Sequence, residues 1–279
     1  MNIYLLALQE DLEPNGDLST KFFDTKILKA QIIAKEAGVF ACSKLIAELL
    51  KTYKEFSKKI FDEEIKFFKK DGEDFSDGEI LVEIIAPSDA LLICERSILN
   101  FLQRTCAIAT STKKLVEKIQ TSKCQILDTR KTAPGLRSLD KLAFKQAGGT
   151  NHRFNLSDAA MLKENHLSLL GEDLLEAIKK LKKEKCKIIV EINKNNLHKL
   201  EEICKESVEQ IMLDNFSVNE LSSIIEKIRH LNKAIKIEAS GGINLSNIAD
   251  YAKLDLDYVS SAAASRAKNI DLSMLMFAS

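Results

Sequence analysis

The fold class is decided by residues 187–240, KIIVEINKNNLHKLEEICKESVEQIMLDNFSVNELSSIIEKIRHLNKAIKIEAS. This stretch contains three short apolar runs, at 187–192, 210–214 and 235–240, and each has the length of a buried strand. The segments between these runs carry apolar residues at helical spacing. Strands that alternate with helices in this way predict βα units and a parallel sheet.

The same alternation extends in both directions from this stretch. Apolar runs also occur at 124–128, 159–163 and 257–261, so the second part of the chain has six predicted strands. Six such strands fit a closed or nearly closed α/β barrel, and an open doubly wound sheet is the competing geometry. The first third of the chain is mixed, because it combines segments at helical spacing with short predicted strands and Asp-Gly turns.

The composition argues against several classes of protein. The 279 residues include 41 Lys and Arg and 41 Asp and Glu, so the chain has no net charge that would attract nucleic acid or an anionic membrane. The six Cys form no Cys-x-x-Cys pair, which argues against a zinc site and for buried, reduced thiols. We see no secretory signal pattern and no apolar run long enough to span a bilayer. We therefore expect a cytoplasmic protein.

Polar side chains follow each of the six apolar runs. They are Asp128 to Lys131, Lys163 to His166, Glu191 with Asn193, Asp214 with Asn215, Glu238 to Gly242, and Ser260 with Ser261. In an α/β barrel the carboxyl ends of the strands meet on one face, and active sites are built there. The pattern therefore predicts a single site assembled from these strand ends.

The charged residues expected at this face are of two kinds. The cationic group is Arg130, Lys131, His152, Arg153 and Lys163, and the acidic group is Glu191, Asp214 and Glu238. Lys, Arg and His bind carboxylates or phosphates, whereas Asp and Glu bind Mg²⁺ or sugar hydroxyls. The turn at 239–243 is either a phosphate-binding loop or a plain tight turn. The residues alone predict an enzyme that handles a small polyanion with a phosphorylated group and Mg²⁺.

Several longer motifs resemble those of one known family. They are QEDLEPNGDLST (9–20), CERSILNFLQRTCAIAT (94–110), LDTRKTAPGLRSLDKLAFKQAGGTNHRFNLSDAAMLKENH (127–166), QIMLDNFS (210–217) and EASGGI (238–243). Together they resemble the quinolinate phosphoribosyltransferases, which are also called nicotinate-nucleotide pyrophosphorylases. The resemblance is collinear from about residue 9 to residue 272.

The resemblance implies a fold and a reaction. The implied fold is an N-terminal α/β sandwich domain, residues 1–106, followed by an α/β barrel of fewer than eight strands, residues 107–279. The first helix could pack on the barrel. The implied reaction joins quinolinate to phosphoribosyl pyrophosphate with Mg²⁺ and gives nicotinate mononucleotide, pyrophosphate and CO₂, on the route to NAD. A homodimer is also implied, in which each site is completed by the neighbouring subunit.

The resemblance further implies roles for individual residues. The two carboxylates of quinolinate are held by Arg130, His152, Arg153 and Lys163 of one subunit and by Arg96 of its neighbour. We expect Lys131, Glu191 and Asp214 to be catalytic: Lys131 lies between the acid and the pyrophosphate, and Asp214 binds ribose and metal, with Glu191 as a weaker metal ligand. Ser240 and Gly241 belong to the 5′-phosphate loop. A simpler alternative for Arg96 is an ion pair with Glu95 on its own helix.

Three positions depart from the family's pattern. Asn193 stands where the family has a second Glu that contacts the ribose, and it brings no charge to a metal. Ala262 stands where Gly lets the backbone approach phosphate, and its methyl group needs room. Arg266 stands where the family has His, and it could bind phosphate itself. We expect all three positions to contact substrate.

These departures leave two alternatives to quinolinate phosphoribosyl transfer. One is the second branch of the family, the ModD-type pyrophosphorylase-like paralogues associated with molybdenum transport, which tend to lack counterparts of Arg96 and Lys163. The other is a non-catalytic protein that binds quinolinate or a similar anion without turnover. Because this chain has both Arg96 and Lys163, we favour the transferase.

Overall fold

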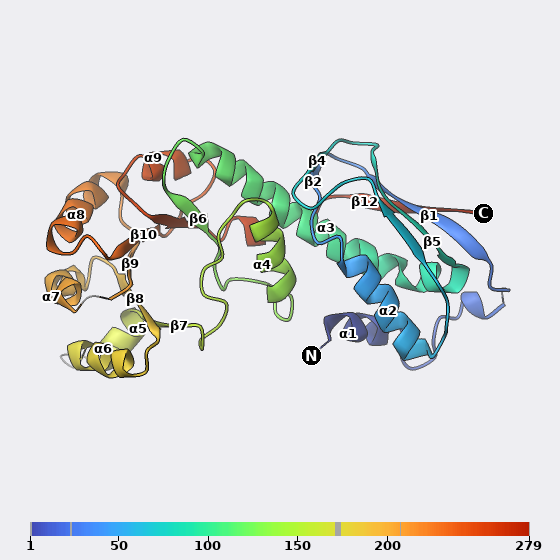
Figure 1. Ribbon diagram of the computed structural model, residues 1–279, viewed down its shortest axis with the longest axis horizontal. Coiled ribbons are helices and arrows are strands. Elements are labelled where there is room, and N and C mark those ends of the chain that lie inside the picture. The colour runs from blue at the N-terminus through green and yellow to red at the C-terminus, as the bar shows by residue number, and fades with distance from the viewer. Residues whose placement is uncertain (1, 23, 171–173, 207, 279) are drawn as a thin grey trace. The chain divides into compact units, whose positions relative to one another are not determined.

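The computed structural model describes residues 2–22, 24–170, 174–206 and 208–278. The chain divides into two compact units, which are described separately (Figure 1). Unit 1 comprises residues 1–113, 132–148 and 264–279, and unit 2 comprises residues 114–131 and 149–263. The predicted domain boundary between residues 106 and 107 lies within a single long helix, α3 (Ser88–Ile119).

Unit 1 is built around a four-stranded sheet with the order β12-β1-β5-β3. Its strands are β1 (Ile27–Ala34), β3 (Glu64–Phe67), β5 (Ile80–Pro87) and β12 (Leu272–Ala278), and neighbouring strands are antiparallel. Side chains alternate along β1, so that Ala30, Ile32 and Ala34 are buried on one face. A two-stranded sheet pairs β2 (Gly38–Val39) with β4 (Asp74–Phe75).

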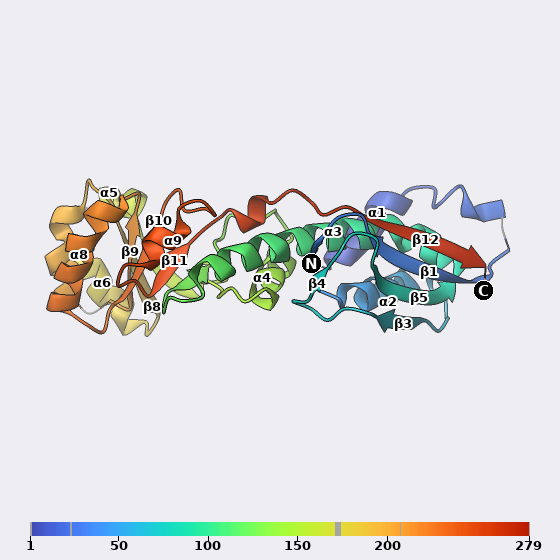
Figure 2. The same cartoon turned by 90° about the horizontal axis from the view of Figure 1, so that it is seen from above.

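Helices α2 (Leu45–Ser57) and α3 cover one face of this four-stranded sheet (Figures 1 and 2). The helix α2 directs Ile46, Leu49 and Leu50 into the core, as its helical spacing of apolar residues predicts. Helix α1 (Ile3–Leu12) packs beside α2. The remaining helices of unit 1 are η1 (Thr20–Phe22), α4 (Arg137–Gln146) and η4 (Ala264–Arg266). Helices on one face of an antiparallel sheet form the predicted α/β sandwich, which is confirmed.

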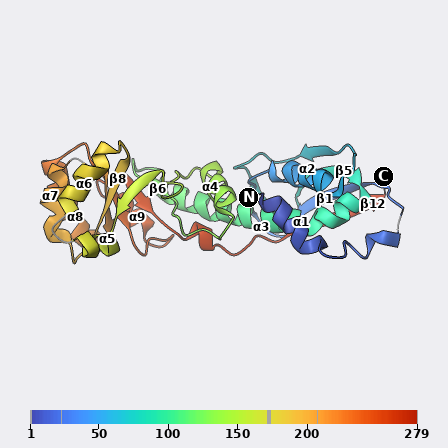
Figure 3. The same cartoon turned by 90° about the horizontal axis from the view of Figure 1, so that it is seen from below.

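Unit 2 is built around a six-stranded parallel sheet with the order β6-β11-β10-β9-β8-β7. The strands are β6 (Gln125–Leu127), β7 (Ala159–Leu162), β8 (Lys187–Ile192), β9 (Gln210–Asp214), β10 (Lys236–Ser240) and β11 (Tyr258–Ser260). The helices of this unit are α5 (Glu164–Leu170), α6 (Leu174–Lys183), η3 (Leu197–Lys199), α7 (Leu200–Lys205), α8 (Val218–Leu231) and α9 (Ile248–Ala252). Helices α6, α7 and α8 lie along the outer side of the sheet (Figure 3).

The strand order distinguishes the barrel from the competing open sheet. Strands β7 to β11 follow one another in sequence order, and β6, the first strand of the unit, lies beside β11, the last. A doubly wound sheet would instead reverse its order at a switch point inside the sheet. The observed order is that of a barrel interrupted between β6 and β7, so the prediction of an α/β barrel with fewer than eight strands is confirmed.

A consequence of this order is that the carboxyl ends of all six strands point to the same edge. Within the part of the chain that the structure describes, no helix is both long and apolar enough to cross a membrane.

Candidate active site

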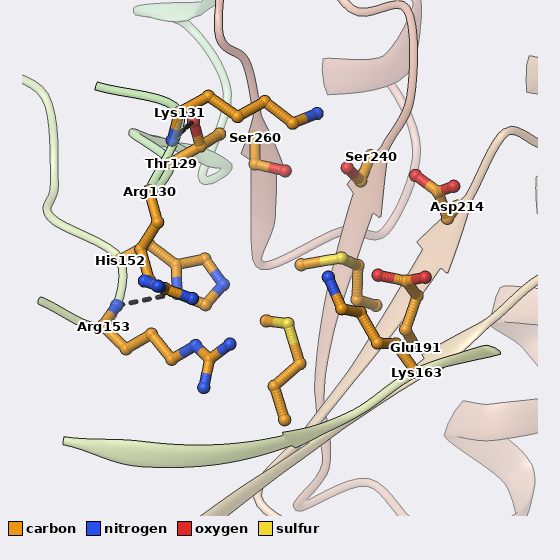
Figure 4. A pocket seen from close by; sticks show the side chains of 12 residues that line it. Thr129, Arg130, Lys131, His152, Arg153, Lys163, Glu191, Asp214, Ser240 and Ser260 are labelled. Atoms are coloured by element: carbon orange, nitrogen blue, oxygen red, sulfur yellow. Dashed lines mark hydrogen bonds between the residues drawn. The ribbon is translucent and has the colours of Figure 1, made fainter. Parts of the chain in front are cut away.

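A cavity of about 460 Å³ opens at the carboxyl ends of the strands of unit 2 (Figure 4). Its lining consists of Thr129, Arg130, Lys131, His152, Arg153, Met161, Lys163, Glu191, Met212, Asp214, Ser240 and Ser260. Ten of these were predicted from the sequence, either at the strand ends or in the cationic group, and Met161 and Met212 were not. All of these residues belong to unit 2, so the cavity is formed within a single unit.

The charges of the cavity are separated between its two sides. Arg130, Lys131, His152 and Arg153 lie on one side, on the loops after β6 and before β7, whereas Glu191 and Asp214 lie on the other (Figure 4). Lys163 lies beside Glu191, and its amine points into the cavity (Figure 4). Burial, and then the nearby Arg130, lower the pKa of Arg153. The cationic side therefore concentrates positive charge that a dianionic ligand would neutralise.

The acidic side consists of two carboxylates on adjacent strands. Glu191 is on β8, and Asp214 is the last residue of β9. Burial is the main cause that raises the pKa of Glu191, and the neighbouring Asp214 raises it further. Carboxylate oxygens are ligands that Mg²⁺ prefers, and the ion commonly takes one or two of them together with substrate phosphates. Among the described residues no group of three or more His, Cys, Asp or Glu could hold a metal alone.

We expect Glu191→Gln to make the protein more stable at neutral pH. Because the pKa of Glu191 is raised in the folded state, the folded protein binds this proton more tightly than the unfolded chain does. Stability is therefore lost as the pH rises through the interval between the unfolded and folded pKa values, and it stays lost above that interval. Urea unfolding at several pH values checks this. The advantage of the Gln variant should disappear below the unfolded pKa of about 4.3, and an equal advantage at every pH would contradict it.

The loop after β9 holds Asp214 in place. Asn215 has a left-handed backbone conformation, with φ of 61°. Its side-chain amide donates a hydrogen bond to Asp214 Oδ2 at 2.6 Å, and its backbone N–H donates to the carbonyl of Ser240 at 3.0 Å. Asn215 thus links the carboxylate at the end of β9 to the end of β10.

Gly241 lies against Asn215 and is not among the residues that line the cavity. Its φ is +94°, and a Cβ atom at this position would lie 2.3 Å from Asn215 Oδ1 and 2.7 Å from Asn215 N. Only glycine has both the backbone freedom and the space that this approach requires. The turn at Ser240–Gly241 is therefore more specialised than an ordinary tight turn.

His152 and Glu238 meet at the base of the cavity. His152 Nε2 is 3.2 Å from Glu238 Oε2, and the two side chains are 7% and 0% exposed. The expectation that Glu238 lies on the open rim, where it could hold Mg²⁺ or a sugar hydroxyl, is wrong. Glu238 is two residues before Ser240 on the same strand, so its side chain points to the same face but one layer deeper.

The backbone around His152 is also fixed by hydrogen bonds. Its N–H donates to Asp128 Oδ1 at 2.8 Å, and its Nδ1 accepts from the N–H of Arg153 at 2.7 Å (Figure 4). Arg153 Nη1 donates to the carbonyl of Ala159 at 2.7 Å. The guanidinium of Arg153 is thus anchored before any ligand arrives.

The three positions that depart from the family's pattern lie elsewhere than in the lining of the cavity. Asn193 donates a hydrogen bond from Nδ2 to Glu164 Oε2 at 2.9 Å, and its Oδ1 accepts from the N–H of Asn195. Ala262 lies in the turn after β11, beside Ser261, whose hydroxyl donates to the carbonyl of Ile243 at 2.6 Å. Arg266 is exposed on η4 of unit 1, and Arg96 is exposed on α3 of unit 1.

Comparisons with known proteins agree along almost the whole chain. The profile described as the N-terminal domain of quinolinate phosphoribosyl transferase matches residues 17–106, and that of its C-terminal domain matches residues 108–275. A protein of Bacillus subtilis (strain 168) named probable nicotinate-nucleotide pyrophosphorylase (carboxylating) is 35% identical over 268 residues, which cover 93% of this chain and 87% of that protein.

Two further matches have similar extent. A nicotinate-nucleotide pyrophosphorylase (carboxylating) of Mycobacterium leprae (strain TN) is 30% identical over 269 residues, covering 95% of this chain and 92% of that protein. The crystal structure of NadC from Streptococcus pyogenes superimposes with a TM-score of 0.86 at 35% identity, and the match covers 99% of this chain and 95% of that one.

Proposed function

The chain belongs to the quinolinate phosphoribosyltransferase family, and from this premise we infer how its cavity carries out the reaction. The enzyme is a pentosyltransferase that joins quinolinate to phosphoribosyl pyrophosphate and releases CO₂ and pyrophosphate, and its product, nicotinate mononucleotide, serves NAD synthesis. The observation that carries the assignment of roles is the separation of charge: one side of the cavity is cationic and the other is acidic.

The cationic side is suited to the aromatic diacid. Arg130 and Arg153 supply planar guanidinium groups that pair bidentately with carboxylates, and Lys163, beside Glu191, adds a point charge from across the cavity. Burial, and then the nearby Arg130, lower the pKa of Arg153, and a dianion placed there would offset both effects. Binding the two ring carboxylates would also turn the pyridine nitrogen toward the acidic side, where the sugar has to lie.

The acidic side is suited to the sugar and its leaving group. The pyridine nitrogen forms a bond to the anomeric carbon as the bond to pyrophosphate breaks, and positive charge grows on the sugar ring. Asp214 and Glu191 would stabilise that charge, and Asn215 holds Asp214 for the task. These two carboxylates would also hold Mg²⁺, which supplies positive charge against the departing pyrophosphate when it is bound.

The position of Lys131 supports a role between the two substrates. Its backbone N–H donates to Thr129 Oγ1 at 3.0 Å, and its amine extends toward Ser260 and Ser240 (Figure 4). A cation there would attract both a quinolinate carboxylate and a phosphate oxygen. Loss of the ring carboxylate as CO₂ then leaves an electron pair on the carbon beside the nitrogen, and the positive nitrogen stabilises that pair until a proton adds. Positioning and electrostatics therefore suffice without a protein nucleophile.

A homodimer and a cytoplasmic location complete the proposal. Arg96 is exposed on α3, where it could reach a carboxylate bound to a second copy of the chain. All six cysteines are free and five are buried, which is typical of proteins in a reducing compartment.

The test is a turnover assay with purified protein. We expect nicotinate mononucleotide, followed by chromatography, only when quinolinate, phosphoribosyl pyrophosphate and Mg²⁺ are all present. Quinolinate binding measured by calorimetry without any product would instead favour a non-catalytic binding protein. If the assay gives no product and calorimetry detects no quinolinate binding, the proposal is contradicted. That result would favour the molybdenum-associated branch of the family.

A further inference from the structure

Glu238 is a fully buried carboxylate beneath the cavity, and the reaction outlined above gives it no role. Its side chain is 0% exposed. The oxygen Oε2 accepts a hydrogen bond from Gln210 Nε2, whereas Oε1 has no hydrogen-bond partner among the described residues. Burying a carboxylate that is only partly satisfied costs stability, so its presence calls for a functional reason.

Glu238 lies close to His152, and this contact suggests a function for the buried carboxylate. Nδ1 of His152 accepts the backbone N–H of Arg153, so in this arrangement Nδ1 carries a lone pair and not a proton. The ring proton is then on Nε2, which is 3.2 Å from Glu238 Oε2, an ion-pair distance that lacks hydrogen-bond geometry. A carboxylate at this distance attracts a proton on Nε2 by its charge, and it therefore favours the tautomer that has its proton there.

The ring of His152 connects the buried interior with the cationic side of the cavity. One ring nitrogen faces Glu238 in the interior, and the other holds the backbone of Arg153. Arg153 is held a second time where Nη1 donates to the carbonyl of Ala159, at the start of β7. A change at Glu238 would therefore be transmitted through the imidazole to the backbone that carries the guanidinium.

We propose that Glu238 is a positioning residue that holds His152 in one tautomer and thereby fixes Arg153 for binding the diacid. His152 then serves as the link between Glu238 and Arg153. The tautomer can be tested without the proposed function, whereas the effect on binding rests on quinolinate being the ligand.

The first experiment observes the tautomer in the intact, wild-type protein. The chain has four histidines, so two-dimensional NMR of protein labelled with ¹⁵N-histidine is tractable, and the signal missing from His152→Gln assigns His152. We expect a protonated Nε2 and an unprotonated Nδ1, both before and after saturation with quinolinate. A proton on Nδ1, or on both nitrogens once quinolinate is bound, would overturn the proposal.

The second experiment measures binding with Glu238→Gln, which keeps the shape of the side chain and removes its charge. We expect the Kd for quinolinate to rise by about tenfold, as losses of supporting partners commonly do, while the KM for phosphoribosyl pyrophosphate changes less than twofold. In a His152→Gln background the same substitution should have little further effect. An unchanged Kd, or an equal loss in both backgrounds, would show that Glu238 does not act through His152.

A matched control separates positioning from general damage to unit 2. Tyr251→Phe removes another buried hydrogen bond of this unit, from the Tyr251 hydroxyl to the carbonyl of Phe216 at 3.1 Å. It should lower the melting temperature and leave the Kd for quinolinate unchanged. If Glu238→Gln does not fold, the NMR result on the wild-type protein decides the proposal. If the wild-type protein fails to bind quinolinate, the proposed function fails, and the tautomer still reports on Glu238.

Discussion

Arg130→Ala and Lys163→Ala are each expected to weaken quinolinate binding by on the order of 2–5 kcal/mol and nearly to abolish turnover. Arg130 lines the cavity, and its Nε is buried with no hydrogen-bond partner among the described residues. Such a donor is ready for an anion that the protein itself does not supply. Lys163 faces the cavity at the end of β7, and its loss would leave a bound carboxylate partly uncompensated.

The measurement is the Kd for quinolinate by calorimetry, together with kcat and KM for both substrates. Lys179→Ala is the control, because it removes the same charge from an exposed position on α6, where its side chain is 61% exposed. Its kinetics should match the wild type. Near-normal kinetics in both Arg130→Ala and Lys163→Ala would show that the cavity is not the acid-binding site.

The Lys163→Ala protein also tests the proposed dimer. If Arg96 acts on the neighbouring protomer, mixing Arg96→Ala with Lys163→Ala creates heterodimers that have one intact site and one doubly altered site. Activity should then reappear on mixing two inactive proteins. If Arg96 acts within its own chain, every site in the mixture carries one substitution, and no activity returns.

The strands of unit 2 were predictable because each is a short apolar run between helical segments. The sequence did not decide whether the sheet closes toward a barrel. That depends on the pairing of β6 with β11, which more than a hundred residues separate. That pairing depends on the curvature of the whole sheet, and no local pattern contains it. The same limit explains β12, which the sequence analysis did not identify. Its seven residues pair with β1, at the opposite end of the chain.

The cavity was predictable where polar residues end a strand, as Lys131, Lys163, Asp214 and Ser240 show. Met161 and Met212 were missed because apolar strand residues were assigned to the core. A signal was present nonetheless, since Met161 is two residues before Lys163 and Met212 is two residues before Asp214. Alternate residues of a strand share one face, so these side chains point into the same cavity one layer below. They pack with Ala159 and Ile189 and give the cavity an apolar base.

The same period of two explains the error at Glu238, whereas Asn193 lies beyond the end of its strand. Glu238 was counted as a rim residue because it is polar and near a strand end, but Ser240 occupies the rim and Glu238 is buried below it. Asn193 follows the last residue of β8, and its side-chain amide donates a hydrogen bond to Glu164 at the start of α5. Alignment to a family motif identifies an equivalent position, whereas side-chain partners on neighbouring loops determine what the residue contacts.

Gly241→Ala is expected to reduce turnover by about tenfold or more and to raise the KM for phosphoribosyl pyrophosphate, with little change in the Kd for quinolinate. The added methyl group would lie 2.3 Å from Asn215 Oδ1 and 2.7 Å from Asn215 N, so Asn215 would have to move. Displacing Asn215 breaks its hydrogen bonds to Asp214 and to Ser240, which lie at the ends of β9 and β10 where the sugar is proposed to bind. A loss of this size corresponds to about 1.4 kcal/mol in the barrier.

Gly242→Ala provides the matched control for this prediction. Gly242 also has a positive φ, of +65°, but nothing lies within 4 Å of its hypothetical Cβ atom. Both variants therefore introduce backbone strain of about 1–2 kcal/mol, and only Gly241→Ala displaces Asn215. We expect both variants to lower the melting temperature. Only Gly241→Ala should strongly reduce turnover and raise the KM for phosphoribosyl pyrophosphate. If the two variants lose turnover equally, backbone strain in the turn explains the loss, and Asn215 has no separate part in holding Asp214.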